Sequence, residues 1–447
     1  MPVSYEHAVE RLLALGHELT SNRKFNLEHM RVLAGALGHP ERRLQTVLIA
    51  GTNGKGSTAA TLASIAEAAG FRTGLYTSPH LVRINERIQI NRELISDAEF
   101  AMIYQRVESA AEALVRTGDL PWHPSFFEML TAIMFEYFAS AGVELAVVEV
   151  GLGGRLDATN IADPCLSILT DIDFDHQKFL GNTLAEIARE KAGILRPGVP
   201  VVLLPQHPAV NETLGQEILE RKALPVSAVS NMPPTTPLIE DNIGNSFPLE
   251  VMGEEIHVTF PLVGRHQLRN LALAITAAEQ LNQVGFRIRP RHIEVGVRNT
   301  RWPARFQVIP AENGGSPEIV LDVAHNPAGA WALRAALSAY YEDRRLTFVF
   351  GAMKDKAIGE IAGILFSLAE QVVVTHADSP RAAGVREIAE LANHTGAVIY
   401  EEPDIPSAIA RAVELAGRAG VVVVTGSIYI VGEALQILTR PALRQGA

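Results

Sequence analysis

The stretch Thr46-Val-Leu-Ile-Ala-Gly-Thr-Asn-Gly-Lys-Gly-Ser-Thr58 joins a short apolar run to a glycine-rich turn and then to a helical pattern. Its glycines carry no Cβ, so the backbone can turn tightly and approach a ligand closely. The unpaired N–H groups and the positive dipole end of the helix that follows favour an anion. Lys55 adds a positive charge, and Ser57 or Thr58 offers a hydroxyl suited to Mg²⁺. This stretch predicts a phosphate cradle for a nucleotide.

The cradle departs from the usual P-loop at one position. That pattern has Ser or Thr directly after the lysine, whereas Gly56 separates Lys55 from Ser57 here. The departure weakens an assignment as a plain nucleotide kinase or GTPase. A glycine-rich connection with an unrelated lysine is the simpler alternative, and the strand–turn–helix context argues against it.

Length and composition limit the class of protein. The 447 residues predict two or three domains, and 47% hydrophobic with 20% charged residues is ordinary for a globular chain. The net charge of −11, from 39 basic and 50 acidic side chains, argues against nucleic-acid binding through a basic surface. The single Cys165 excludes an intrachain disulfide framework, and no signal peptide or membrane span is visible. We therefore expect a cytoplasmic protein with no membrane partner.

Polar residues follow several predicted strands, where ligands bind in open α/β sheets. Ser78 and His80 follow the strand 72–77, although a simple Ser-Pro turn is equally consistent with this pattern. Glu149 ends the apolar strand 145–150, where a carboxylate is costly unless it is paired or on a metal. Its place at the strand end favours a metal over a structural salt bridge. We predict a ligand edge there.

The run Asp171-Ile-Asp-Phe-Asp-His176 follows another predicted strand, 166–170. Its alternating acids resemble a calcium loop. That assignment fails because His176 stands at position six in place of Gly, and Asn182 at position twelve in place of Glu. A magnesium or phosphate role is the better prediction for this cluster.

Lys191 lies on the apolar face of a predicted helix that starts with a capping box, Thr183 with Glu186. A lysine on such a face must extend its amine to solvent, pair with acids or be modified. Spacing alone favours the first of these. Phe126 and Phe127, in the helix 125–139, are more typical of a core than of a ligand site.

A second α/β domain is predicted after a join at 298–305, because strands and helices alternate from there on. Its predicted strands are 318–323, 346–351, 371–375, 397–400 and 420–425. We place the domains at 1–298 and 299–447. Residues 231–248, rich in proline, are predicted to form a surface excursion. Asn270, at the start of the helix 271–281, is either a local capping residue or a ligand contact.

Five motifs in order resemble the folylpolyglutamate synthase/dihydrofolate synthase family of the Mur ligase superfamily. They are Gly51-Thr-Asn-Gly-Lys-Gly-Ser57, Thr77-Ser-Pro-His80, Glu149-Val-Gly-Leu-Gly-Gly-Arg-Leu-Asp-Ala-Thr-Asn160, Arg189-Glu-Lys-Ala-Gly193 and Asp322-Val-Ala-His-Asn-Pro327. The resemblance extends to Gly426-Ser-Ile-Tyr-Ile-Val-Gly-Glu433, essentially the whole chain. It implies an α/β fold with a P-loop Mur-ligase-like ATP-binding domain followed by a smaller Rossmann-like domain.

The resemblance also implies a reaction, the ATP-dependent addition of L-glutamate to dihydropteroate or to folyl(poly)glutamate such as tetrahydrofolate. A carboxylate near a triphosphate sets like charges together, at about 4 kcal/mol per unit pair at ~4 Å and an effective dielectric of ~20. Mg²⁺ and Lys55 would offset that repulsion. The implied partners are ATP, Mg²⁺ (two ions) and these small substrates, with no nucleic acid or membrane, and a monomer is expected.

Residue roles carried over by the resemblance fall into four sets. Ser57, Ser78 and Glu149 would hold one Mg²⁺ and His176 a second, while Lys191 would carry a carbamate and act in catalysis with Lys55, His176 and Arg305. The nucleotide would be bound by Thr52, Asn53, Gly54, Lys55, Gly56, Ser57, Asn270, Arg305 and Asp322. The pterin would contact Leu156, Asp157 and Ala158, with Phe126 or Phe127 stacking on it, and glutamate would contact His325 and Ser427.

Three positions depart from the family pattern. Ala304 and Arg92 stand where the family has Gly, and Asn26 replaces a Gly near the N-terminal pterin loop. A Mur-type ligase acting on a cell-wall nucleotide peptide remains an alternative, which the Glu149–Arg155 stretch disfavours. A nucleotide-binding regulatory module without chemistry is a third, which Lys55, Glu149 and His176 argue against.

Overall fold

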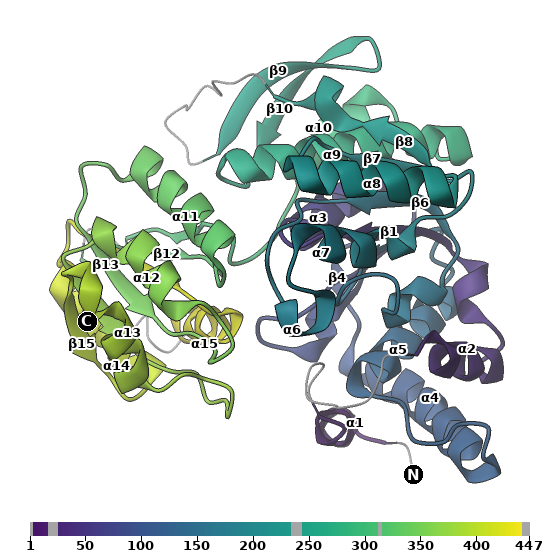
Figure 1. The fold of residues 1–447 in the computed structure, drawn as a ribbon, viewed down its shortest axis with the longest axis horizontal. Coiled ribbons are helices and arrows are strands. Elements are labelled where there is room, and N and C mark those ends of the chain that lie inside the picture. Colours follow the sequence, from purple (N-terminus) through teal and green to yellow (C-terminus); the bar gives the residue numbers. More distant parts are fainter. Residues whose placement is uncertain (1–2, 17–25, 234–243, 312–314, 440–447) are drawn as a thin grey trace. The chain divides into compact units, whose positions relative to one another are not determined.

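The computed structural model describes residues 3–16, 26–233, 244–311 and 315–439. They form two compact units. Unit 1 contains the described residues up to 233, together with 245–261 and 267–301, and unit 2 contains 244, 262–266 and the described residues from 302 onward. Each unit is built on its own sheet (Figure 1). The mixed α/β fold predicted from the sequence is thereby confirmed.

Unit 1 carries an eight-stranded sheet in the order β4-β3-β2-β5-β1-β6-β7-β8, in which the β2–β3 and β3–β4 pairs are antiparallel and the other pairs parallel. The strands are β1 (Gln45–Ala50), β2 (Thr73–Tyr76), β3 (Ile88–Ile90), β4 (Glu93–Leu94), β5 (Leu145–Glu149), β6 (Pro164–Leu169), β7 (Pro200–Leu203) and β8 (Leu224–Ser227). Parallel strands are covered on both faces, so their sequences are nearly continuous apolar runs. β5 is buried at every residue for this reason.

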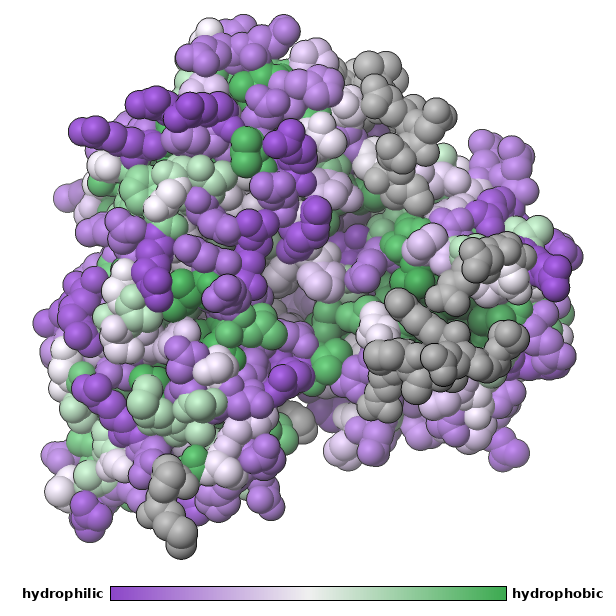
Figure 2. Space-filling model, turned by 180° about the vertical axis from the view of Figure 1, so that it is seen from behind, coloured by the Kyte–Doolittle hydropathy of each residue, from purple (hydrophilic) through white to green (hydrophobic). Residues whose placement is uncertain are grey.

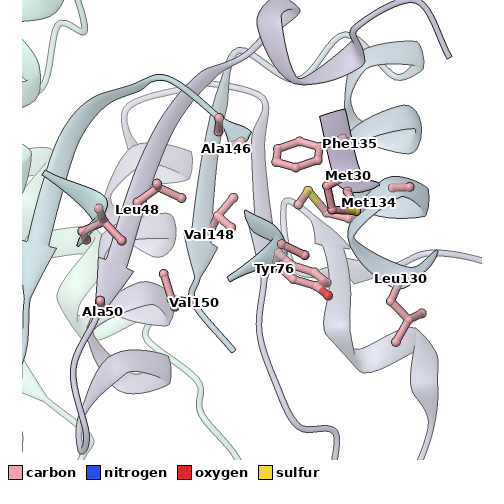
Figure 3. Packing of buried hydrophobic residues seen from close by; sticks show 14 of the residues in the cluster. Met30, Leu48, Ala50, Tyr76, Leu130, Met134, Phe135, Ala146, Val148 and Val150 are labelled. Atoms are coloured by element: carbon pink, nitrogen blue, oxygen red, sulfur yellow. The ribbon is translucent and has the colours of Figure 1, made fainter. Parts of the chain in front are cut away.

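Helices cover both faces of this sheet (Figure 1). They are α1 (Tyr5–Ala14), α2 (Leu27–Ala36), α3 (Lys55–Ala68), α4 (Asp97–Thr117), α5 (Phe126–Ser140), α6 (Gln177–Leu180), α7 (Leu184–Lys191), α8 (Pro208–Arg221), α9 (Arg265–Leu281) and α10 (Pro290–Arg298). On one face, Leu48, Ala146 and Val148 of the strands pack towards Met134 and Phe135 of α5 (Figure 3). Alternate strand residues share a face, which is why positions two apart meet the same helix.

Short 3-10 helices connect several of these elements. They are η1 (Pro40–Arg43), η2 (Ile84–Arg87), η3 (Ala158–Ile161), η4 (Ala192–Ile194), η5 (Ala228–Asn231) and η6 (Asn282–Val284) in unit 1, and η7 (Phe366–Leu368) and η8 (Asn393–Thr395) in unit 2. The predicted site residue Ala158 is the first residue of η3, and η4 directly follows Lys191.

A separate hairpin, β9 (Asn245–Val251) with β10 (Glu254–Phe260), corrects part of the prediction for residues 231–248. Pro248 lies inside β9 opposite His257, in a sheet of two strands. Each strand of such a sheet has a free edge, and proline is tolerated there because no ladder donor is required of it. Residues 234–243 lie outside the described part of the chain.

Unit 2 carries a six-stranded sheet in the order β11-β12-β16-β13-β14-β15. The strands are β11 (Gln307–Ile309), β12 (Glu318–Leu321), β13 (Leu346–Phe350), β14 (Gln371–Val374), β15 (Val398–Glu401) and β16 (Val421–Thr425), and the helices are α11 (Pro327–Tyr340), α12 (Ile358–Leu365), α13 (Val385–Ala392), α14 (Ile405–Ala416) and α15 (Ile428–Thr439). All five predicted strands are confirmed. The antiparallel β11, three residues long, was not predicted.

The surface shown in Figure 2 is largely hydrophilic, with smaller hydrophobic patches between the polar residues. In the part of the chain that the structure describes, no helix is long and apolar enough to cross a bilayer.

Candidate functional site

The predicted cradle leads from β1 into α3, with two glycines that cannot be replaced without displacing a neighbour. Gly54 has φ +89°, and a Cβ on it would lie 2.2 Å from Oδ1 of Asn270. A Cβ on Gly51 would lie 1.8 Å from Oγ1 of Thr170. Asn270 itself is buried and donates from Nδ2 to Oε1 of Gln267 at 3.0 Å. The structure therefore brings Asn270 against the cradle, 216 positions (270 − 54) away in sequence.

Two of the cradle's backbone donors are already used inside the protein. The N–H groups of Thr52 and Asn53 both donate to the carbonyl of Asp171, at 2.8 and 3.1 Å. The Thr52 hydroxyl bonds both the carbonyl and the N–H of Asp173, each at 3.0 Å. The first N–H groups of α3, from Lys55 to Ser57, have no carbonyl one turn earlier to meet. The start of α3 is thus the part of the cradle that can offer donors to an anion.

Two lysines converge on the Gly51 carbonyl. Lys55 Nζ donates to it at 3.1 Å and to the Thr52 carbonyl at 3.2 Å, and Lys191 Nζ donates to Gly51 at 2.7 Å. Lys191 is 4% exposed, so the expectation that its amine extends to solvent is wrong. Burial, followed by repulsion from Lys55, lowers the pKa of Lys191 to about 7, against attraction from Asp175 and Asp157. Its amine therefore exchanges protons near neutral pH.

The oxygen donors predicted for magnesium end neighbouring strands. β1 pairs with β5, and β5 with β2, so Glu149 and the turn after β2 lie beside the cradle at one edge. Glu149 is 5% exposed, and its Oε2 accepts a hydrogen bond from the Ser78 N–H at 3.1 Å. Ser57, at the start of α3, is buried as well. Hydroxyl and carboxylate oxygens suit a hard cation such as Mg²⁺, so the donor set fits this ion.

No group of three or more His, Cys, Asp or Glu side chains positioned to hold a metal occurs among the described residues. The predicted set does not depend on one, because two of its four members are serines. His176 begins α6 with φ +50°, and its Nε2 lies 3.9 Å from Oδ2 of Asp175. A second ion at His176 would need further ligands, such as phosphate oxygens.

One acid of the 171–176 cluster has a structural partner. Both carboxylate oxygens of Asp171 bond Arg269, at 2.6 Å to Nη2 and 2.9 Å to Nε. This bidentate pair ties the segment that follows β6 to α9. The magnesium or phosphate role of the cluster stays a prediction. Arg269 was missed, although its position beside Asn270 is a signal that could have found it.

Arg87 is a second residue that the sequence did not single out. It is 3% exposed, and its Nε donates to Nδ1 of His80 at 2.8 Å. Burial, together with the nearby Arg87 charge, lowers the pKa of His80 to about 3, so this ring is neutral. The guanidinium also lies 5.4 Å from the centre of the Phe126 ring. An arginine placed between the apolar residues Ile84 and Ile88 is the only signal for it.

The structure separates the two candidate stacking residues. Phe126 belongs to the core beneath Arg87, whereas the Phe127 ring lies on Gly151, where an added Cβ would approach its Cζ to 2.4 Å. Asp157 organises the loop, because Oδ2 accepts from the Leu152 N–H at 2.8 Å and Oδ1 from the Thr159 N–H at 3.0 Å. Leu156 remains half-exposed beside it, and Ala158 is buried.

In unit 2 the predicted residues gather where β12 and β16 end. These strands are parallel neighbours, and the Gly426 N–H donates to the Ala324 carbonyl at 3.1 Å, which sets His325 and Ser427 on adjoining turns. His325 Nδ1 lies 2.9 Å from the Val323 carbonyl. The Ser427 hydroxyl is buried and accepts from the Tyr429 N–H at 3.2 Å.

Asp322 and Arg305 form the charged part of this edge. Asp322 accepts from the Phe306 and Ala324 N–H groups, each at 2.9 Å. Burial raises the pKa of Asp322, and the positive charge of Arg305 opposes that shift. Arg305 lies between two residues with left-handed backbone, Ala304 at φ +57° and Phe306 at φ +48°. Its direction is therefore set by an unusual chain path, in which Ala304 occupies a conformation that favours glycine.

Comparison with known proteins agrees with this arrangement. Residues 49–278 match the Mur ligase middle domain, and residues 304–428 match the Mur ligase, glutamate ligase domain. The dihydrofolate synthase/folylpolyglutamate synthase of Bacillus subtilis is 34% identical, over 92% of this chain and 94% of the relative. The fold and the matched domains define an ATP-dependent ligase of the Mur type.

Solved structures make the assignment more specific. A Mycobacterium tuberculosis folylpolyglutamate synthase complexed with ADP and AMPPCP superposes with a TM-score of 0.88, at 32% identity, covering 97% of this chain and 99% of that one. Escherichia coli FolC in complex with DHPP and ADP gives 0.81 at 27% identity, covering 98% of each chain. The chain belongs to the folylpolyglutamate synthase/dihydrofolate synthase family.

Proposed function

We propose that this ligase adds L-glutamate to dihydropteroate, to folyl(poly)glutamate, or to both, with ATP giving ADP and phosphate. The observation that carries the proposal is the convergence of Lys55 and buried Lys191 on the Gly51 carbonyl, beside the strand end that holds Glu149. That edge places the Lys55 cation, with Lys191 beside it, where a triphosphate would meet the substrate's carboxylate. The family relatives supply the substrate class.

The reaction proceeds in two transfers. The substrate's carboxylate oxygen attacks the γ-phosphorus, an O–P bond forms, the bridging P–O bond breaks, and ADP leaves with an acyl phosphate remaining. The glutamate amine, having lost a proton, then attacks the acyl carbon, forms the C–N bond and releases phosphate. Lys55 and the N–H groups at the start of α3 stabilise the negative charge of the phosphoryl group in flight.

Residue roles follow from chemistry and position within each unit. Ser57, Ser78 and Glu149 would hold one Mg²⁺ and His176 a second, and the metal's positive charge would screen the phosphates. Asn270 would bind the nucleotide beside Gly54, with Arg305 and Asp322 contributing from unit 2. The pterin would lie against Phe127 and Leu156 rather than Phe126, and His325 and Ser427 would receive glutamate. We propose that residues 1–298 form the ATP- and pterin-binding domain and residues 299–447 the glutamate-binding domain.

Lys191 is proposed to work as a carbamate. An amine with a pKa of about 7 is substantially unprotonated at neutral pH, and only the unprotonated amine attacks carbon dioxide. The protonated amine first loses a proton; the neutral nitrogen then forms a bond to the carbon of carbon dioxide and releases a second proton, so that the buried cation becomes an anion. That anion can contact the metal or orient the phosphoryl group, as an ammonium cannot.

The test is phosphate release by the purified protein with ATP, Mg²⁺, L-glutamate and either dihydropteroate or tetrahydrofolate. Release that requires every component, with a product heavier by one glutamyl residue, supports the proposal. Comparison of the two acceptors decides between the first and the later glutamylation. Full ATP turnover without a pterin, or turnover only with a uridine-linked muramic acid, would overturn it.

A further inference from the structure

A cavity of about 430 Å³ in unit 1 is lined by five arginines, Arg31, Arg42, Arg155, Arg196 and Arg221. We call it the arginine cavity. Its volume is that of a small-ligand site. It does not include the cradle, Lys191 or Glu149. Two acids, Glu41 and Asp163, also line the cavity, so arginines outnumber acids there in a chain of net charge −11.

Four of the arginines, Arg31, Arg42, Arg155 and Arg221, have acidic partners that leave some of their donors unused. Ion pairs join Arg31 to Glu28 at 3.5 Å and exposed Arg42 to buried Glu41 at 3.4 Å. Shorter ones join Arg155 to Glu190 at 2.8 Å and Arg221 to Glu217 at 2.9 Å. Of those four acids only Glu41 lines the cavity. A guanidinium has five N–H donors. In each of these ion pairs the arginine uses only one or two of its guanidinium nitrogens.

Arg196 shows that the positive charges are close together. Its two Nη atoms donate to backbone carbonyls of Asn160, Ala162 and Gly193, and its Nε lies 3.9 Å from exposed Asp163. Burial lowers its pKa, and Arg221 and Arg31 lower it further, against the attraction of Asp163. Arg221 and Arg31 are therefore near enough to repel Arg196, and a further anion in the cavity would relieve that repulsion.

The wall of the cavity is also the joint that holds the 151–160 loop. Asn160 donates from Nδ2 to the carbonyls of Arg155 and Gly193, both at 3.1 Å, and the Arg155 N–H donates to the Glu190 carbonyl at 2.9 Å. Gly193 packs so closely that an added Cβ would lie 2.3 Å from the Arg155 Cα. Lys191 is two residues before Gly193, so this joint is close to Lys191 along the chain.

We propose that the arginine cavity binds a small polyanion with two or more phosphate or carboxylate groups, and that this ligand braces the joint between the 151–160 loop and η4. Guanidinium groups bind both kinds of oxyanion through paired hydrogen bonds. The several arginines favour a ligand with several charges over a single anion. The inference does not depend on the proposed reaction.

The test is calorimetric titration of the full chain with tripolyphosphate and, separately, with citrate. ADP is present at saturation, so that phosphate does not report on the cradle. Mg²⁺ is left out because both probes chelate it, and ionic strength is held constant. The double variant Arg42→Gln/Arg221→Gln is compared with a matched control, Arg43→Gln/Arg116→Gln, whose exposed arginines do not line the cavity.

We expect saturable binding of at least one probe, weakened tenfold or more in the cavity variant and unchanged in the control. The tighter probe identifies a phosphate or a carboxylate ligand. Hydrogen exchange of peptides covering 151–161 and 192–197 should slow when the probe binds. Absence of binding, or equal weakening in both variants, would overturn the site. Binding without slower exchange would overturn the brace.

Discussion

The two sheet edges carry fixed charge in opposite ways. At the edge of unit 1, the amines of Lys55 and Lys191 are held by one backbone carbonyl, that of Gly51. At the edge of unit 2, the anion Asp322 is held by two backbone N–H groups, those of Phe306 and Ala324. Both edges lie at the carboxyl ends of parallel strands, where ligands bind in this class of fold.

The difference shows that the fold places a site at the carboxyl ends of the strands, whereas the residues that follow the strands determine the charge of that site. In unit 1 the carbonyl holds the Lys55 amine, whose positive charge suits phosphates, beside the amine of Lys191. In unit 2 the N–H groups hold the carboxylate of Asp322, and this carboxylate attracts the guanidinium of Arg305. Each edge can be tested by removing its central charge.

Lys191→Ala removes the buried amine of the first edge, and we expect the largest effect from it. Ligase activity should fall about 10³-fold, which corresponds to about 4 kcal/mol in the barrier. Phosphate release is the measurement, and Lys178→Ala, an exposed lysine of α6, is the control. Wild-type protein should also gain activity with bicarbonate and show 44 Da of added mass that is lost on acidification. Full activity of Lys191→Ala would exclude a functional carbamate.

The stability of the protein should depend on pH through Lys191. Its pKa is about 7 in the folded chain and near 10.5 when unfolded, so between these values the unfolded chain binds one more proton. Wild-type stability therefore rises with pH across this window, by at most about 1.4 kcal/mol per unit, and the penalty is complete below pH 7. Urea denaturation of wild type and Lys191→Met, with carbon dioxide excluded, gives the difference.

The expected pattern has a definite direction. The variant is more stable relative to wild type at pH 6 than at pH 9, by a few kcal/mol at most. A difference that stays flat with pH would mean that the buried amine titrates as an ordinary lysine.

Gly54→Ala tests the close approach at the cradle. The added Cβ would lie 2.2 Å from Oδ1 of buried Asn270, in a backbone conformation of φ +89°. We expect the KM for ATP to rise at least tenfold. Gly70→Ala separates the two causes, because Gly70 has φ +91° with nothing within 4 Å. That control should lose about 1 kcal/mol of stability and keep its ATP affinity. Equal kinetic effects in both variants would contradict the steric explanation.

Asp322→Asn removes the charge of the second edge while keeping its shape. One of the two backbone N–H groups loses a charged acceptor, so we expect a loss of about 1–2 kcal/mol in stability. Activity should fall about tenfold because Arg305 loses its attracting partner. Asp343→Asn, at an exposed acid of unit 2, is the control for charge alone. Unchanged activity in Asp322→Asn would remove this edge from the site.

The sequence predicted the strands and their ends because buried parallel strands are nearly continuous apolar runs, and polar residues follow them. It did not predict Arg269 with Asp171, or Arg87 with His80, since each pair joins residues whose proximity depends on the tertiary fold. The burial of Lys191 was accessible only through family resemblance, because spacing alone favours an exposed amine. Three-residue β11 carries too little pattern to be detected.

The smallest expected effects concern stability, at two positions where the family has glycine and this chain does not, one in each unit. Ala304 in unit 2 and Arg92 in unit 1 both have left-handed backbone, at φ +57° and +65°. Arg92 also bonds Glu67 at 2.5 Å and the Asn299 carbonyl at 3.2 Å, so its side chain compensates for the strain. The Ala304 methyl offers no such bond.

Ala304→Gly should therefore stabilise unit 2 by about 0.5 kcal/mol, the relief of left-handed strain less the added freedom of glycine in the unfolded chain. Arg92→Gly should give no gain, because the lost ion pair, worth about 0–1 kcal/mol, offsets the same relief. Arg92→Ala keeps the strain and loses the pair, so it should be the least stable of the three. Urea denaturation of the three variants gives the order. A gain from Arg92→Gly as large as that from Ala304→Gly would show that the arginine's contacts add nothing.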